Sequence, residues 1–528
     1  MSAEAIAATA PRGWRRAPAW LAAQRGARAD AAAAGLGVLS ALALPPLFLL
    51  PALLVAVPGL LVLIGSADGV RQAARRGFWF GFGNNLLGLY WVTEAILVEA
   101  AKFWWLVPLA VPALAAAMAA FIAAAAGVAR LARPGWPRVP ALAGAWVLTD
   151  LARQFALTGF PWNLWGADWA FPGRLGEIFL QPAALVSVHG LTLGTLLLAG
   201  APLWGRRGRA AALLLLAAWF GFGLWRLSWP APKPPGLTAV LVQGDVAEGQ
   251  KWDRAVAAQI FARYLRLTRA GVAEARADQP GTARPLVVWP ETASPYLLGS
   301  EPPVRQAIAA AAGGATEGPA AARVVALVGA VRFGGHRRPR NSLFALTGAG
   351  IVAGIYDKHH LVPFGEYQPD WLPLPIQLVP GGGFAPGPGP RTLSLPGLPP
   401  IGPLICYEAI FPGEIVQPGH RPSLLVNVTN DAWFGDSTGP RQHLVAARLR
   451  AVEEGLPLLR AANTGISAVF GPRGRLVARL GLDRRGALVA PVPGALPATL
   501  FARLGLWIPF GLALAMLGLG LAGRRFTA

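Results

Sequence analysis

The sequence predicts a multi-pass α-helical membrane domain of about eight spans, joined to an α/β domain of roughly 270 residues. The first observation is composition: hydrophobic residues make up 54% of the chain and charged residues only 14%, whereas soluble domains carry about 25% charged residues. The second is position, because long apolar runs fill the first 228 residues and the pattern changes after the Pro-rich segment SWPAPKPPG at 228–236. Short apolar runs then alternate with polar helical stretches, which indicates a layered α/β domain.

Eight apolar segments account for the membrane domain. A bilayer core requires about 20 apolar residues for each helix that crosses it. The first two segments, on either side of Pro45 and Pro46, are shorter and predict a tilted hairpin. The eight predicted spans lie at 31–45, 47–65, 78–98, 104–130, 141–155, 183–202, 210–228 and 502–522.

Arginine clusters on alternate loops predict the topology. They follow the second, fourth, sixth and eighth spans, and the N-terminal stretch is also basic. The positive-inside rule therefore places both termini in the cytoplasm and the α/β domain on the outer side. The net charge of +21 could also indicate nucleic acid, but the clusters lie between apolar runs, so no nucleic-acid partner is expected. The arginines are Arg12, Arg15, Arg16, Arg25 and Arg28; Arg71, Arg75 and Arg76; Arg130, Arg133 and Arg138; Arg206, Arg207 and Arg209; and Arg524 and Arg525.

The predicted domain boundaries follow the same changes of pattern. Residues 1–228 form a membrane domain with seven spans, residues 229–500 the extracytoplasmic α/β domain, and residues 501–528 the eighth span with a short cytoplasmic tail. The aromatic-rich loop 158–169 is predicted to contribute to a lipid-facing surface, with simple interfacial anchoring as the alternative.

The α/β domain is predicted to contain helices at 253–277, 302–313 and 437–455, between short buried strands. Residues 371–400 are rich in Pro and Gly, which predicts a long surface loop that acts as a mobile lid. A domain of this length can bury a full core by itself.

Three local sequences place reactive side chains where strands are predicted to end, which is where α/β folds build their sites. They are VVWPET with Glu291, YDKHHLVPFGEY with Lys358 and Glu366, and PLICYEAIF with Cys406 and Glu408. A cysteine nucleophile needs a base to take its proton and a group that stabilises the developing oxyanion. A glutamate and a lysine supply these two functions, so the set predicts nucleophilic catalysis.

Cys406 is the single cysteine of the chain. A lone cysteine is most often a small core residue, and this alternative is set aside only because of the neighbouring motifs. An intramolecular disulfide is impossible, and the six histidines show no metal-ligand spacing, so no metal or other cofactor is expected.

Larger motifs carry a resemblance to a known family. They are VQGD at 242–245, KWD at 251–253, WPE at 289–291, KHHLVPFGEY at 358–367, CYE at 406–408, NDAWFG at 430–435 and the helical QHL and ARLRAVE at 442–453. Residues 237–490 resemble the nitrilase (carbon–nitrogen hydrolase) superfamily. The whole chain, with its seven spans plus one, resembles the apolipoprotein N-acyltransferase family of the bacterial inner membrane. The resemblance implies a nitrilase-like α-β-β-α sandwich for the α/β domain.

The resemblance also implies catalytic roles. Glu291 is expected to be the general base, Lys358 to support the oxyanion and Cys406 to be the nucleophile. Glu366 and Glu408 are expected to be supporting carboxylates, with Glu366 orienting either Lys358 or the acyl carbonyl.

Four aromatic residues match positions that this family uses around its site or on lipid-facing loops: Trp252, Tyr407, Trp433 and Phe434. Core packing is the alternative for Trp252 and Trp433. Tyr407 directly follows the nucleophile, so its backbone N–H could serve the oxyanion.

The implied function is transfer of an acyl chain from a membrane phospholipid, through a thioester on Cys406, to the N-terminal amine of a diacylglyceryl-cysteine lipoprotein. The implied protein is a monomer. The alternative enzyme is a membrane-tethered amidase that acts on a small C–N bond. A third possibility, a transporter or lipid-binding scaffold without activity, is disfavoured because Glu291, Lys358 and Cys406 are all present.

Overall fold

The computed structural model describes residues 16–98, 100–251, 253–280, 284–334, 338–369 and 383–523. The chain divides into two compact units. One unit extends to Trp229 and resumes at Arg503, and the other comprises Pro230–Ala502. Trp252, Arg12, Arg15, Arg524, Arg525 and the 371–382 part of the predicted lid lie outside the described residues.

The first unit is helical throughout its regular structure. Its helices are α2 (Arg16–Ala23), α3 (Gly26–Ala41), η1 (Leu50–Ala52), α4 (Leu53–Gly65), α5 (Val70–Gly88), α6 (Val92–Leu97), α7 (Ala100–Phe103), η2 (Trp104–Leu106), α8 (Val107–Ala129), α9 (Arg138–Phe155), η3 (Trp165–Ala170), α10 (Arg174–Leu180), α11 (Ala183–Gly200), η4 (Ala201–Trp204), α12 (Gly205–Ser228) and α18 (Trp507–Ala522). The short helix α17 (Leu500–Leu504) crosses the boundary between the two units.

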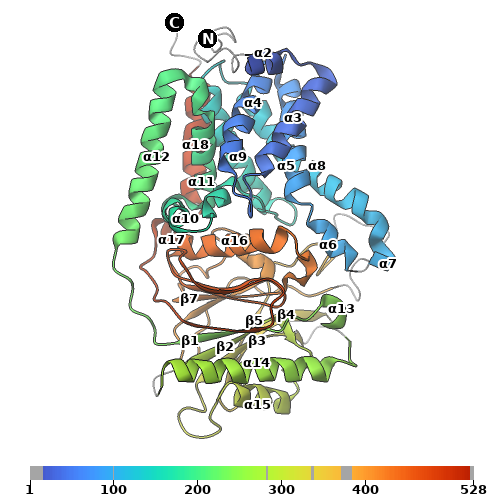
Figure 1. The fold of residues 1–528 in the computed structure, drawn as a ribbon, viewed down its shortest axis with the longest axis vertical. Coiled ribbons are helices and arrows are strands. Elements are labelled where there is room, and N and C mark those ends of the chain that lie inside the picture. Colours follow the sequence, from blue (N-terminus) through green and yellow to red (C-terminus); the bar gives the residue numbers. More distant parts are fainter. Residues whose placement is uncertain are drawn as a thin grey trace. The chain divides into compact units, whose positions relative to one another are not determined.

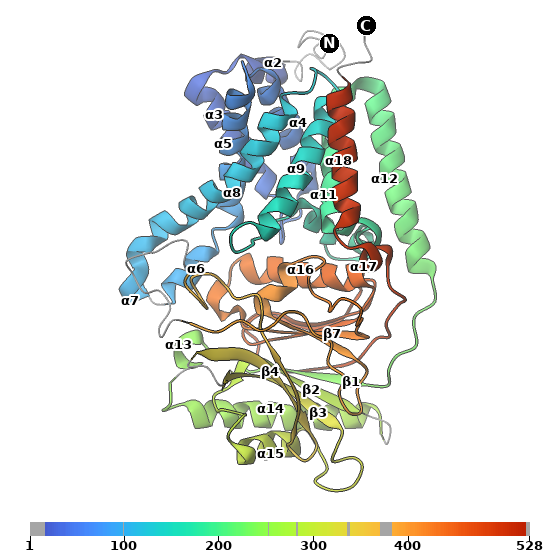
Figure 2. The same ribbon diagram turned by 180° about the vertical axis from the view of Figure 1, so that it is seen from behind.

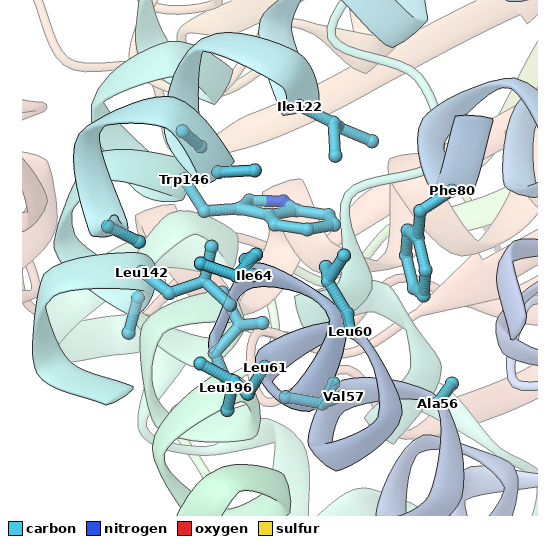
Figure 3. Close-up of a cluster of buried hydrophobic side chains, with 14 of the residues drawn as sticks. Ala56, Val57, Leu60, Leu61, Ile64, Phe80, Ile122, Leu142, Trp146 and Leu196 are labelled. Carbon is cyan, nitrogen blue, oxygen red and sulfur yellow. The ribbon is translucent and has the colours of Figure 1, made fainter. Parts of the chain in front are cut away.

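A continuous apolar core holds these helices together. Figure 3 shows Trp146 of α9 and Leu196 of α11 among side chains of α4. Phe80 of α5 meets Trp146 edge to face, with ring centroids 6.1 Å apart. Small residues allow close approach, because a Cβ on Gly37 of α3 would lie 2.0 Å from the Phe80 carbonyl oxygen.

Two helical stretches among the described residues are long and apolar enough to cross a membrane, judged by length and composition alone. They are Ala100–Ala129 and Ala183–Ser228, and the latter covers two of the predicted spans. The chain turns within it at Gly205, which has φ 68°, and α11 and α12 contact each other. Two shorter apolar helices are Leu50–Gly65 and Trp507–Ala522.

Two expectations about this unit are corrected. The third predicted span, 78–98, is replaced by α5, which begins at Val70, and by the separate short α6. In the aromatic loop 158–169, Trp162 and Trp165 are buried, and Trp165 packs on Trp146 with ring centroids 4.7 Å apart. These two indoles therefore belong to the core, because neighbouring helices offer them more apolar contact than a surface would.

The second unit contains two β-sheets. The first has the order β11-β1-β2-β3-β4-β5 and the second β10-β9-β8-β7-β6. Strands β1, β2 and β3 are parallel to one another, as are β6, β7 and β8, and the outer strands pair antiparallel. The strands are β1 (Thr238–Gln243), β2 (Pro285–Ser294), β3 (Val324–Phe333), β4 (Pro339–Thr347), β5 (Val352–Asp357), β6 (Ile401–Ile405), β7 (Leu424–Thr429), β8 (Leu458–Ala462), β9 (Ser467–Phe470), β10 (Leu476–Leu480) and β11 (Gly486–Pro491).

Alternating faces of the strands fix a four-layer order. Leu241 of β1 packs with Val426 of β7 in the core between the sheets, whereas Val240 packs with the helix layer on the other side. Helices α14 (Ala257–Asp278) and α15 (Pro302–Ala311) cover the first sheet, and α16 (Gly439–Glu454) covers the second. Figures 1 and 2 show this order from two sides. The unit is thus the layered α/β domain that the sequence pattern predicts, in the α-β-β-α form that the family resemblance implies.

Part of the predicted lid is attached to the domain. Residues 383–400 follow the 370–382 segment, and their backbone is hydrogen bonded to the strands beside them. The N–H of Gly387 donates to the carbonyl of Lys358 at 2.7 Å, and the N–H of Phe384 donates to that of Glu366 at 2.8 Å. This half of the predicted lid therefore supports the Lys358 segment.

Candidate active site

Cys406 lies at the carboxyl end of a buried parallel strand. Strand β6 ends at Ile405, and Cys406 begins the short helix η6 (Cys406–Ile410). Its φ is 51°, in the left-handed region that residues other than glycine rarely occupy. The side chain is 6% exposed. The strand-to-helix turn thus presents a thiol that is almost completely shielded from water.

Glu291 belongs to the late part of strand β2 and is fixed through both carboxylate oxygens. Oε1 accepts hydrogen bonds from Asn341 Nδ2 at 2.7 Å and from Lys358 Nζ at 3.1 Å. Oε2 accepts one from the backbone N–H of Asn430 at 2.9 Å. The following residue, Thr292, has φ 46°, so the chain bends at this point. The carboxylate is therefore held in one orientation by three elements of the fold.

Lys358 directly follows strand β5 and is buried between two carboxylates. Its Nζ lies 2.8 Å from Glu366 Oε2 and 3.1 Å from Glu291 Oε1. Glu366 is held by Asn341 Nδ2 at 3.0 Å and by the N–H of Val362 at 2.8 Å. Burial alone would lower the pKa of Lys358, but the charges of Glu291 and Glu366 outweigh burial and raise it well above its usual range. Lys358 is therefore a fixed cation.

The thiol of Cys406 is protonated at neutral pH. Burial raises its pKa first, and the negative charges of Glu291 and Asp431 raise it further. The charge of Lys358 and a hydrogen bond with the Thr429 side chain oppose this rise without cancelling it. A thiol of this kind needs a base at the moment of attack, because little thiolate is present beforehand.

Glu408 has a different environment from Glu291. It accepts hydrogen bonds from the N–H of Ile405 and of His359, both at 2.7 Å, and from the hydroxyl of Tyr356 at 2.9 Å. Burial alone would raise its pKa, but the hydrogen bond and charge of His359 and the backbone N–H groups lower it. Glu408 thus ties the Lys358 segment to the end of the Cys406 strand.

Glu408→Gln is expected to destabilise the full-length protein at pH 7 by about 1–3 kcal/mol, because an amide cannot accept all these hydrogen bonds. The folded-state pKa of Glu408 is lowered, so its contribution is present above the unfolded value of about 4.3 and is lost as the pH falls through the folded value. The difference in unfolding temperature between wild type and variant, measured in detergent, should therefore become smaller as the pH is lowered. The exposed Glu317→Gln is the matched control. An equal gap at every pH would contradict this assignment.

The four aromatic positions differ in their surroundings. The Tyr407 ring is buried against Phe411, with centroids 5.2 Å apart, and Phe434 is half-buried beside His443 at 6.0 Å. Trp433 is 37% exposed, which contradicts core packing as its role. Trp252 lies outside the described residues.

Sequence reasoning missed several residues that hold this site. Asn430 and Asp431 lie inside NDAWFG, and His443 lies inside the QHL motif, so both motifs could have drawn attention to them. Asn341 lies near the start of the antiparallel strand β4 and bridges the two glutamates. No sequence signal marks it, because a single asparagine in a strand is unremarkable.

Comparisons with known proteins cover both units. The carbon–nitrogen hydrolase family model matches residues 243–497, and the model of the apolipoprotein N-acyltransferase N-terminal domain matches residues 36–201. An apolipoprotein N-acyltransferase of Sinorhizobium medicae is 40% identical over 491 residues, which cover 87% of this chain and 89% of that protein. One from Rhodopseudomonas palustris is 38% identical over 497 residues, covering 89% and 90%.

A solved amidase of the nitrilase superfamily from Nesterenkonia is similar at 21% identity. The alignment covers 52% of this chain and 96% of the amidase, with a TM-score of 0.35. The assignment of the second unit to a nitrilase-like fold rests on the family model and on the two-sheet layer order.

Proposed function

Because this chain belongs to the apolipoprotein N-acyltransferase family, we propose that it moves an acyl chain from a membrane phospholipid to the N-terminal amine of a diacylglyceryl-cysteine lipoprotein. The observation that carries the proposal is the Glu291–Lys358–Glu366 cluster at the strand ends, electrostatically coupled to the buried Cys406 thiol. This arrangement suits acyl transfer through a covalent intermediate. No metal or other cofactor takes part in the proposed reaction.

In the first half-reaction, the Cys406 thiol attacks the ester carbonyl of the phospholipid and its proton passes to Glu291. The raised pKa of the thiol supports proton transfer during the attack and not before it, so the proton leaves as the C–S bond forms. The tetrahedral oxyanion is stabilised by Lys358 and by the Tyr407 N–H. When it collapses, the C–O bond breaks and Glu291 returns the proton to the leaving alkoxide. The products are a lysophospholipid and a thioester on Cys406.

In the second half-reaction, the lipoprotein amine attacks the thioester carbonyl. Glu291 accepts a proton from the amine, an amide bond forms and the C–S bond breaks. The proton then returns to Cys406, so the enzyme is regenerated in its starting state. Glu366 keeps Lys358 oriented at 2.8 Å, and Glu408 holds the strand end that carries the nucleophile.

The proposed location is the bacterial inner membrane, with a multi-pass domain at 1–228, an extracytoplasmic catalytic domain at 229–500 and a final span in 501–528. Apolar helices at Leu50–Gly65, Ala100–Ala129, Ala183–Ser228 and Trp507–Ala522 support part of this topology, as does the alternation of arginine clusters. Both termini are then cytoplasmic and the catalytic domain is periplasmic. A membrane site suits two lipid substrates that are anchored in the same leaflet. Trp433, which is 37% exposed, is proposed to contact the acyl chains together with Phe434 and Trp252. The protein is proposed to act as a monomer.

A thioester on Cys406 is the expected product when the purified protein meets phospholipid vesicles without an acceptor. Intact-protein mass spectrometry should show the added mass of one acyl chain. A lipopeptide with a free N-terminal amine should then remove that mass, whereas the same lipopeptide with an acetylated amine should not. Acylation by small amides but not by phospholipid would replace this proposal with the membrane-tethered amidase.

A further inference from the structure

A buried histidine lies directly behind the proposed nucleophile. His443 belongs to helix α16 and its ring is completely buried. Its Nε2 lies 3.0 Å from the backbone carbonyl oxygen of Cys406, and its Nδ1 lies 2.9 Å from Asp431 Oδ1. The histidine thus contacts the main chain of the nucleophile, on the peptide that joins Cys406 to Tyr407.

The hydrogen-bond partners of the His443 ring indicate that Nε2 carries a proton. A carbonyl oxygen only accepts, so the contact with Cys406 requires an N–H on Nε2. Burial opposes ionisation of Asp431, but the charges of Arg460 and His443 lower its pKa to about 2. Nδ1 faces this carboxylate and also Arg460 Nη2 at 3.1 Å. If Nδ1 donates to Asp431 the ring is a cation, and if it accepts from Arg460 the ring is neutral, which is the form that burial and the charge of Arg460 favour by lowering the pKa of His443. In both cases Nε2–H donates to the carbonyl of Cys406.

The histidine is itself held in place. Asp431 Oδ2 accepts from Arg460 Nη2 at 2.8 Å, and Asp431 Oδ1 accepts from the Thr429 hydroxyl at 3.0 Å. Arg460 also donates to Asn427 Oδ1 at 2.5 Å. The side chains of Asn427, Thr429, Asp431 and Arg460 are all buried, and all but that of Asp431 come from strands β7 and β8. The ring therefore has little freedom to turn away from Cys406.

The peptide bond transmits this constraint to the next residue. A peptide unit is planar and trans, so its C=O and N–H point in opposite directions. Fixing the Cys406 carbonyl against His443 fixes the Tyr407 N–H on the far side of the same plane. The donated hydrogen bond also polarises the peptide and makes this N–H a stronger donor.

We propose that His443 is a positioning residue that aims the Tyr407 N–H at the oxyanion by anchoring the carbonyl of Cys406. The inference rests on the proposed function, because it assumes that Cys406 attacks a carbonyl carbon. His443 touches neither the substrate nor the thiol in this scheme. It also helps to hold the positive φ of Cys406, since the carbonyl of that residue cannot rotate freely.

Comparing two reactions of Cys406, acylation and alkylation, distinguishes a positioning role of His443 from a general structural role. Acylation passes through an oxyanion, whereas alkylation by iodoacetamide displaces iodide at a saturated carbon and forms none. For His443→Ala in the full-length protein, the acylation rate constant should fall roughly 10²- to 10³-fold, as when an oxyanion donor is removed. The alkylation rate and the KM for the acyl donor should stay near their wild-type values.

Two further variants serve as controls. His443→Gln retains an N–H donor that can reach the Cys406 carbonyl and should recover part of the acylation rate. His420→Ala removes an exposed histidine whose ring Nδ1 lies 3.3 Å from the carbonyl oxygen of Pro418, and the variant should behave as wild type. Thermal unfolding of each variant shows whether it remains folded.

The donors are phospholipid vesicles and p-nitrophenyl butyrate, so that the acyl donor of the wild type and the role of His443 are tested separately. A wild type that accepts only the nitrophenyl ester contradicts the phospholipid assignment, but it still reports on His443. Acylation and alkylation that fall in the same proportion in His443→Ala would overturn the positioning role. Unchanged acylation in that variant would overturn it as well.

Discussion

Cys406→Ala is expected to abolish acyl transfer while the protein remains folded. No other side chain can form the thioester, because Cys406 is the single cysteine. Loss of a covalent nucleophile costs on the order of 10⁶-fold in kcat in the serine protease subtilisin. Intact-protein mass spectrometry after incubation with phospholipid should therefore show no added acyl mass, and no N-acylated lipopeptide should form.

The fold should tolerate this change because only a sulfur atom is removed. Truncation of a small buried side chain costs about 1 kcal/mol, and alanine faces the same positive φ as cysteine. The variant should unfold close to the wild-type temperature in detergent. Cys406→Ser is the matched variant, since its hydroxyl fills nearly the same space but is a much weaker nucleophile beside a carboxylate base. Normal acyl transfer by Cys406→Ala would refute the nucleophile assignment.

The α/β architecture could be predicted from sequence because its periodicity is local. Apolar runs such as that of β7 are buried on both faces, and the predicted helices at 253–277, 302–313 and 437–455 correspond to α14, α15 and α16 within four residues at each end. The carboxyl ends of strands are the usual place for a site in such folds, and this predicts that the motifs ending β2 and β6 are functional. These two strands belong to different sheets, so only the resemblance to a known family predicts that Glu291 and Cys406 share one site.

The supporting contacts could not be predicted because they join segments far apart in the chain. Asn341 reaches Glu291 from 50 residues away, and His443 reaches Cys406 from 37 residues away. Helix ends in the first unit were missed for another reason. Arg75 and Arg76 were predicted to lie in a loop, but both belong to α5. Each forms a salt bridge with the Asp30 carboxylate at an N–O distance of 2.6 Å. The length of an apolar run predicts where a chain could cross a bilayer. It does not predict where the helix ends, because a helix can extend into polar residues when their side chains form ion pairs or reach water.

Lys358→Met is expected to remove activity and to destabilise the protein at the same time. Without the ammonium group, the buried Glu291 and the partly buried Glu366 remain as two carboxylates that share Asn341 as a donor. Two neighbouring negative charges raise the pKa of the pair and favour uptake of a proton. Glu291 is then protonated part of the time and cannot accept the proton of the thiol. Removal of one partner from a buried ion pair costs about 3–5 kcal/mol. Acyl transfer should fall by at least about 10³-fold, since the oxyanion also loses its cation.

The double variant Lys358→Met/Glu366→Gln separates the two effects. Compared with the wild type it removes one positive and one negative charge, so the cluster regains its wild-type net charge and loses the additional negative charge of Lys358→Met, and much of the lost thermal stability should return. Acyl transfer should stay low, because neither Glu366→Gln nor Met restores a cation at the oxyanion. Unfolding temperature and thioester formation, measured on the same full-length preparations, give the two readouts. If stability and acyl transfer both recover in the double variant, Lys358 serves only to neutralise the carboxylates and has no role at the oxyanion.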